Sequence, residues 1–207
     1  MEFLKLSLST VFHPGEAFRY LQKDRSKFNY LPVALLLFLI FAVRSASIYI
    51  THFPLAKLNP RTANLGIELA KLYIPVLTWV IASYAITSIM DGESLLREIL
   101  LSTCYALIPY IVLTLPVNLL SHIMESSQSG LYNGILNLIS GWSVFLIFMS
   151  IKVMNQYSMK KTILVCFLSI CTMLLIWATI ALFFAISSQF INFIQEVMIE
   201  VRLKLVY

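Results

Sequence analysis

Long apolar stretches alternate with short polar segments along the chain. Five of these stretches reach the roughly 20 residues that a helix needs to cross a bilayer. They cover residues 31–51, 69–90, 99–120, 131–151 and 162–186. Because lipid offers no hydrogen-bond partners to an open backbone, each stretch is expected to be helical. The pattern predicts an all-α integral membrane bundle of five transmembrane helices.

The two terminal segments have a different, amphipathic pattern. Residues 1–30 combine apolar and basic side chains, and Phe18 and Leu21 share one helical face. We expect a cytoplasmic interfacial segment that lies along anionic headgroups, or a simple topological anchor. Residues 187–207 repeat apolar side chains at helical spacing, which predicts an amphipathic helix on the outer membrane surface or docked on a partner. The domains expected are therefore 1–30, 31–186 and 187–207.

The composition supports a membrane protein and argues against a soluble domain. Only 12% of the 207 residues are charged and 59% are hydrophobic, whereas soluble domains carry about 25% charged residues. The net charge of +5 would suggest nucleic-acid binding in a soluble protein. Here the basic residues lie between apolar stretches, so membrane orientation explains them and no nucleic-acid partner is expected.

The distribution of Lys and Arg predicts the orientation in the membrane. With the N-terminus inside, nine basic residues lie in inner segments and four in outer segments, leaving Arg44 and Lys71 within the stretches. The inner set is Lys5, Arg19, Lys23, Arg25, Lys27, Arg97, Lys152, Lys160 and Lys161, and the outer set is Lys57, Arg61, Arg202 and Lys204. We expect a multi-pass cell-membrane protein with a cytoplasmic N-terminus and an extracytoplasmic C-terminus.

Arg44 is the most informative single residue, because it lies about two-thirds of the way along the first span. A charge at that depth costs at least about 2.5 kcal/mol, so it needs a partner or a path to water. Glu68 and Lys71 lie three residues apart near the outer end of the second span, within reach if the two helices form an antiparallel hairpin. Three interpretations stay open: snorkelling to the headgroups, a structural ion pair, and an ion or substrate site.

The third and fourth spans carry weaker signals. Pro109 removes the backbone bond to the carbonyl of Tyr105, so the third helix should kink and leave carbonyl groups free. Such broken helices form ion sites in transporters, but ordinary packing kinks are commoner. Gly134, Asn137 and Gly141 share one face of the fourth span, which predicts close contact with another helix, within the protein or in a partner.

Signatures of enzymes are missing from the sequence. None of the three histidines belongs to an HExxH motif, there is no GxSxG, and no glycine-rich phosphate loop occurs. No acidic residue lies deep within an apolar stretch, where intramembrane proteases and proton-coupled transporters need one. We therefore predict no catalytic residue, no metal site, no cofactor and no enzymatic activity.

Several short motifs follow one another along the chain. They are residues 13–18 (HPGEAF), 91–98 (DGESLLRE), the Tyr-x-x-x-Pro element from Tyr105 to Pro109, Trp142, Lys152, and Tyr157 to Lys161. Taken in this order, they resemble the bacterial branch of the Yip1 family of five-span membrane proteins. The resemblance covers about residues 10–186 and implies five spans with the N-terminus inside and the C-terminus outside. Eukaryotic members act in vesicle trafficking with small GTPases, but their acidic-Leu-x-Gly-Pro element is missing here, so no small GTPase partner is expected.

Three functional hypotheses follow from these features. The leading one is a non-enzymatic accessory or assembly subunit of a membrane complex, with a transporter as one candidate, since some bacterial members of the family are linked with transport systems. The second is a small permease or channel, motivated by Arg44 and the broken third span. The third is a membrane-shaping protein, motivated by the amphipathic segments at both ends. All three place the chain in the lipid bilayer.

Overall fold

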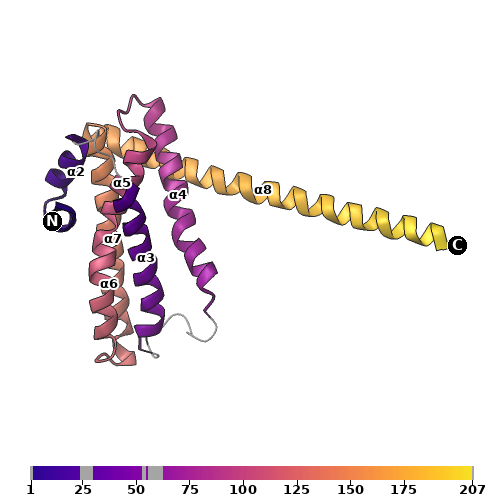
Figure 1. The fold of residues 1–207 in the computed structure, drawn as a ribbon, viewed down its shortest axis with the longest axis horizontal. Coiled ribbons are helices and arrows are strands. Elements are labelled where there is room, and N and C mark those ends of the chain that lie inside the picture. Colours follow the sequence, from indigo (N-terminus) through magenta and orange to yellow (C-terminus); the bar gives the residue numbers. More distant parts are fainter. Residues whose placement is uncertain (1, 24–29, 53–54, 56–62, 207) are drawn as a thin grey trace. The chain divides into compact units, whose positions relative to one another are not determined.

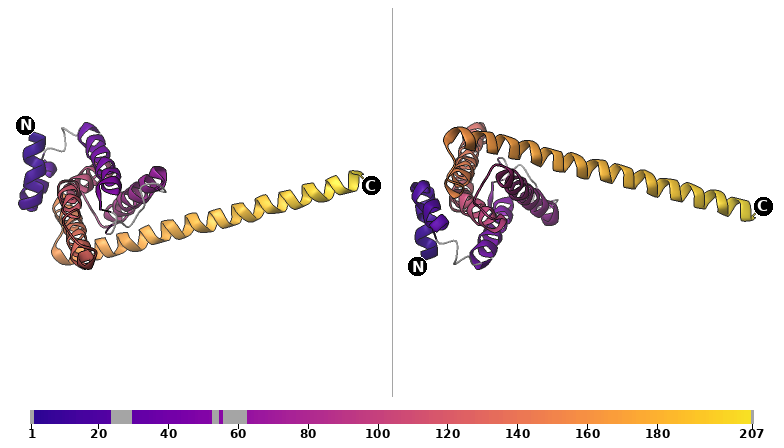
Figure 2. Two further views of the ribbon diagram at one scale, coloured as in Figure 1. Left: turned by 90° about the horizontal axis from the view of Figure 1, so that it is seen from below. Right: turned by 90° about the horizontal axis from the view of Figure 1, so that it is seen from above.

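The computed structural model of the protein describes residues 2–23, 30–52, 55 and 63–206, and these contain helices but no strands (Figure 1, Figure 2). The helices are α1 (Glu2–Phe12), α2 (Pro14–Lys23), α3 (Tyr30–Ile50), α4 (Leu65–Ile89), α5 (Leu96–Ala106), α6 (Ile108–Leu120), the 3₁₀ turn η3 (Ser126–Gln128), α7 (Ser129–Met154) and α8 (Met159–Val206). Five stretches are long and apolar enough to cross a membrane, namely α3, α4, residues 96–120, α7 and residues 159–198. The predicted all-α five-span bundle is therefore confirmed.

The orientation of the bundle stays a prediction. Four of the basic residues used in the charge count lie outside the described residues, and these are Arg25, Lys27, Lys57 and Arg61.

The chain divides into two compact units, residues 1–169 and 170–207, and each is described by itself. In the first unit α3 packs against α4, α5 and α6, while α7 packs against α5 and α6 (Figure 1). One core cluster joins α2, α3, α5 and α7 through Phe18, Val33, Leu36, Tyr105 and Leu146. A second cluster joins α4, α5, α7 and the first turns of α8 through Val80, Ile99, Ile151, Tyr157 and Val165.

Helix α2, in the N-terminal segment, packs against the bundle. Its Phe18 is 0% exposed and belongs to the first core cluster, where Leu21 packs beside it. The helix packs against α7. Packed protein side chains bury the ring of Phe18 and add dispersion contacts, so this apolar face is not available to lipid. This packing is compatible with both interpretations of residues 1–30, and both stay predictions.

A polar junction ties the loop between α4 and α5 to the loop between α7 and α8. The Oδ1 atom of Asn155 accepts hydrogen bonds from the backbone N–H of Ser94 at 3.1 Å and from its hydroxyl at 2.7 Å. The Tyr157 hydroxyl donates to the carbonyl of Met90 at 3.1 Å. Burial raises the pKa of Tyr157 and the negative charge of Asp91 raises it further, so this hydroxyl stays a donor at neutral pH.

Gly92 fits this junction because it has no side chain. A Cβ atom there would lie 2.6 Å from both Asn155 Oδ1 and the Tyr157 hydroxyl, and 2.8 Å from the backbone oxygen of Thr87. Asn155 and Tyr157 are buried and hydrogen-bonded, so neither side chain can move away without losing its partners. The junction therefore holds the two loops in a single arrangement.

The last helix, α8, is 48 residues long and contains neither glycine nor proline. Its first turns are buried in the first unit through Thr162, Val165 and Ser169. From residue 170 to 198 most of its large apolar side chains are exposed, with Phe183 and Phe184 at 72% and 75%. We expected a separate amphipathic helix from residue 187. The structure has no boundary there, since no residue near this point breaks a helix.

The junction yields a stability prediction. Gly92→Ala should lower the free energy of unfolding by about 2 kcal/mol or more, because the added methyl group overlaps three oxygen atoms. Gly134→Ala is the matched control, since a Cβ there meets nothing within 4 Å and alanine is the better helix former. The measurement is thermal unfolding of both purified variants in detergent. Equal midpoints for the two variants would contradict the prediction.

Candidate functional site

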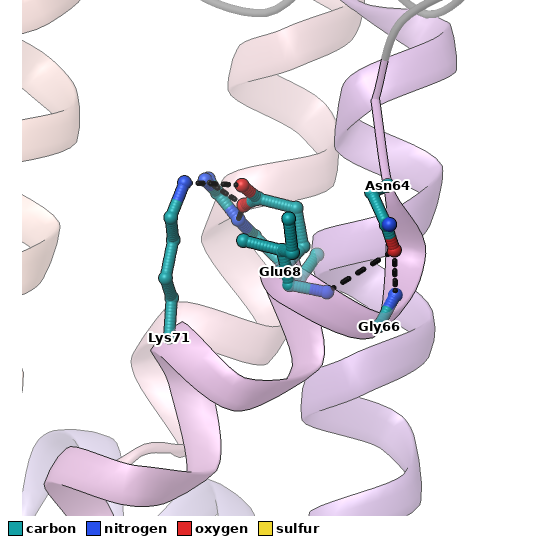
Figure 3. A network of polar contacts seen from close by, with 6 residues as sticks. Asn64, Gly66, Glu68 and Lys71 are labelled. Carbon is teal, nitrogen blue, oxygen red and sulfur yellow. Dashed lines mark hydrogen bonds and ion pairs between the residues drawn. The ribbon is translucent and has the colours of Figure 1, made fainter. Parts of the chain in front are cut away.

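Glu68 is a buried carboxylate at the start of α4, with a side chain only 3% exposed. Asn64 caps the helix, and its Oδ1 accepts hydrogen bonds from the N–H groups of Gly66 at 2.9 Å and Ile67 at 3.3 Å (Figure 3). This cap determines where α4 begins. Glu68 therefore falls in the first turn, where the positive end of the helix dipole favours an ionised carboxylate.

Two cations from different positions converge on this carboxylate. The Nε and Nη2 atoms of Arg44, on α3, donate to Glu68 Oε2 at 3.2 and 2.8 Å. The Nζ atom of Lys71, about one turn along α4, donates to the other carboxylate oxygen at 2.9 Å (Figure 3). The predicted approach of Arg44 to Glu68 across a helix hairpin is confirmed.

Arg44, Glu68 and Lys71 form an ion cluster with a net charge of +1, because two cations share one carboxylate. Pairing offsets the cost of placing Arg44 within a span. The side chain of Arg44 is 37% exposed and that of Lys71 is 62% exposed. Of the interpretations left open for Arg44, the structure shows the ion pair with Glu68. Lys71 is the most exposed member of the ion cluster.

A polar cavity of about 220 Å³ lies beside the ion cluster, between α3, α6 and α7. Arg44 and Tyr110 line it, and both also line a neighbouring cavity of about 300 Å³ that includes Glu68 and Lys71. The other polar side chains around the first cavity are Ser47, Thr51, Thr114, Asn118, Tyr132, Asn137 and Ser140. The guanidinium group of Arg44 therefore borders two cavities while it is held by Glu68.

The cavity wall contains hydrogen-bond donors that have no partner. The Tyr132 hydroxyl donates to Asn118 Oδ1 at 2.8 Å, but the Nδ2 atom of Asn118 is buried without a hydrogen bond. The Oγ1 atom of Thr114 is buried in the same way. Among the described residues, no group of three or more His, Cys, Asp or Glu side chains is placed to hold a metal ion. The free groups of this cavity suit an acceptor or an anion.

Comparison with known protein families matches residues 8–195 to the Yip1 domain. The chain belongs to the Yip1 family. It is an integral membrane protein with the five spans expected of that family. The comparison with curated proteins found no match, and the comparison with solved structures found none either.

The Tyr-x-x-x-Pro element of this Yip1 chain builds the break in its third span. Helix α5 ends at Ala106 and α6 begins at Ile108, with Pro109 in the first turn of α6, where a missing N–H costs little. The break between the two helices lies at Leu107, the one residue that separates them. Tyr105 is 3% exposed in the first core cluster, away from the cavity. Tyr110, which directly follows the motif, lines the cavity.

The small-residue face of α7 makes no tight contact in the described part of this Yip1 chain. A Cβ atom at Gly134 or Gly141 would meet nothing within 4 Å among the described residues. Both glycines are exposed, and Asn137 between them is exposed as well but lines the cavity. Packing of this face onto another helix of the bundle is not observed, so its contact with another helix stays a prediction.

Sequence reasoning missed most of the cavity wall. It did not select Tyr110, Thr114 or Asn118, which recur every four residues along α6, or Tyr132 on α7. The signal that could have found them is their spacing. The α6 positions lie on one face of that helix, just as Arg44, Ser47 and Thr51 lie on one face of α3. Polar side chains that recur at this spacing inside an apolar span point to a shared polar cavity.

The ion cluster predicts a rank order of stabilities. Glu68→Gln should lower the free energy of unfolding by about 2–4 kcal/mol, because it leaves two cations facing each other without a counter-charge. Lys71→Gln should cost less than about 1 kcal/mol, since Lys71 is exposed and Arg44 still neutralises Glu68. Arg44→Gln should fall between them. Urea unfolding in mixed micelles measures all three, and a larger loss for Lys71→Gln than for Glu68→Gln would contradict the order.

Proposed function

We propose that this Yip1 family member is a non-enzymatic protein of the bacterial plasma membrane that acts as an accessory or assembly subunit of a membrane complex. A transporter is one candidate companion. The observation that carries the proposal is the unbroken length of α8, which extends well beyond what a bilayer can cover.

The dimensions of α8 support a protein partner. At 1.5 Å per residue its 48 residues span about 72 Å, whereas the hydrocarbon core is about 30 Å thick. Lys160 and Lys161 lie at the N-terminal end of α8, so the length that exceeds the hydrocarbon core lies at its C-terminal end. There Phe190, Ile194 and Val197 share one face and are 63%, 40% and 42% exposed. A face of this kind outside lipid is stabilised by burial against another protein.

The same length argues against the membrane-shaping alternative. A helix that crosses the bilayer can lie flat on its surface only after a sharp bend, and such bends occur at proline, at glycine or at disrupted turns. Helix α8 contains neither residue and is helical from Met159 to Val206. The partner surface that best fits is therefore an extracytoplasmic part of another integral membrane protein, rather than the lipid headgroups.

The proposal includes the orientation that the charge distribution predicts, with the N-terminus in the cytoplasm and the tail outside. Alkaline phosphatase, which is active only outside the cytoplasm, should be active when fused after Tyr207 and inactive when fused after Gln156. The opposite pair of activities would overturn the orientation and move the proposed partner surface to the cytoplasm.

The tail gives a direct test of assembly. Val197→Glu places a charge on the apolar face of α8 and should abolish recovery of a specific membrane protein after gentle solubilisation, measured by quantitative mass spectrometry. Asn192→Glu introduces the same charge on the opposite face and is the matched control, which should retain the companion. A companion that both variants keep equally, a complex that contains only copies of this chain, or a monodisperse protein with no companion would count against the proposal.

The second candidate function is a small permease, and the observation in its favour is the polar cavity beside Arg44. Transport needs a water-filled path from this cavity to both membrane faces. Flux into liposomes decides this candidate: a rate at background for phosphate and for small organic anions would remove it without affecting the assembly proposal.

A further inference from the structure

We propose that the cavity between α3, α6 and α7 is a binding site for an oxyanion, a phosphate or carboxylate group carried by a lipid headgroup or by a small solute. The inference goes beyond the role in assembly, because it concerns a ligand held by the isolated chain. It rests on three properties of the cavity, which are its free donors, its charge and its size.

The free donors are built into the wall and have no other use among the described residues. Asn118 is 1% exposed and Thr114 is 4% exposed, and both line the cavity. Asn118 Nδ2 and Thr114 Oγ1 are buried without a hydrogen bond. A buried donor left without an acceptor destabilises the protein, and most such groups in proteins are satisfied. In the proposed complex, an acceptor bound in the cavity is the missing partner of both donors.

The charge around the cavity selects an anion over a neutral acceptor. Arg44 lines the cavity, and no Asp or Glu is among its lining residues. Glu68 is the carboxylate of the ion cluster, and its two oxygens already accept hydrogen bonds from Arg44 and Lys71. The cluster as a whole keeps a net charge of +1, and its second cation, Lys71, lines the neighbouring cavity. An anion that accepts from Arg44 and from neutral donors makes the strong, charge-assisted type of hydrogen bond.

The size of the cavity limits the ligand to a small group. A volume of about 220 Å³ corresponds to roughly seven water molecules at about 30 Å³ each. Pockets for drug-sized molecules measure about 300–1,000 Å³. The cavity therefore accommodates a free oxyanion or the head of a lipid, and the rest of a larger molecule would have to lie outside it.

Thr114→Val tests the site because it removes one hydroxyl and keeps the shape of the side chain. Delipidated full-length protein in detergent is titrated with inorganic phosphate and with acetate by calorimetry, and with phosphatidylglycerol by native mass spectrometry. Thr114→Val should weaken binding about tenfold, which is the usual effect of losing one hydrogen bond to a charged group. Thr114→Ser, which keeps the hydroxyl, should restore most of the affinity.

Thr103→Val is the matched control. Thr103 is 1% exposed on α5 and its hydroxyl is also buried without a partner, but it does not line the cavity. Its valine variant should bind as the unmodified protein does. Binding of phosphate or acetate that Thr114→Val weakens identifies a solute site, and weakening for phosphatidylglycerol alone identifies a headgroup site. Absence of binding for all three probes, or equal affinities in the two valine variants, would overturn the proposal.

Discussion

The carboxylate of Glu68 needs a counter-charge among apolar helices, and this need links the packing of α3 against α4 to the candidate site. Asn64 begins α4 at a point that places Glu68 in the first turn. Arg44 then ties α3 to α4 through two hydrogen bonds to one oxygen. Once the guanidinium group is held there, it borders the polar cavity on α3, α6 and α7. One ion pair therefore serves both the packing of the hairpin and the chemistry of the candidate site.

The five spans and this ion pair could be predicted because their physical costs are large and local. An apolar stretch of about 20 residues has few alternatives to a membrane helix, and an intramembrane arginine has few alternatives to a carboxylate. The cavity was harder to predict. Its polar side chains come from α3, α6 and α7, so no single stretch of the sequence shows that they face one another.

Amphipathic segments pose a different difficulty, because sequence shows that a face must be covered but not what covers it. In α2 the answer is the protein itself, since Phe18 completes a core that includes residues far away in the sequence. Helix α8 contains no helix-breaking residue, so it continues as one helix past residue 187, although the composition changes there. The glycine face of α7 has no partner among the described residues, so its role depends on molecules outside this chain or on residues that are not described.

The uninterrupted α8 has a mechanical consequence. From residue 170 to residue 206 the helix is about 55 Å long at 1.5 Å per residue, and it contains no hinge. Sharp bends in helices occur at proline, at glycine or at disrupted turns, and this segment contains neither residue. The two ends of this segment are therefore held about this distance apart, and no internal bend can bring them together.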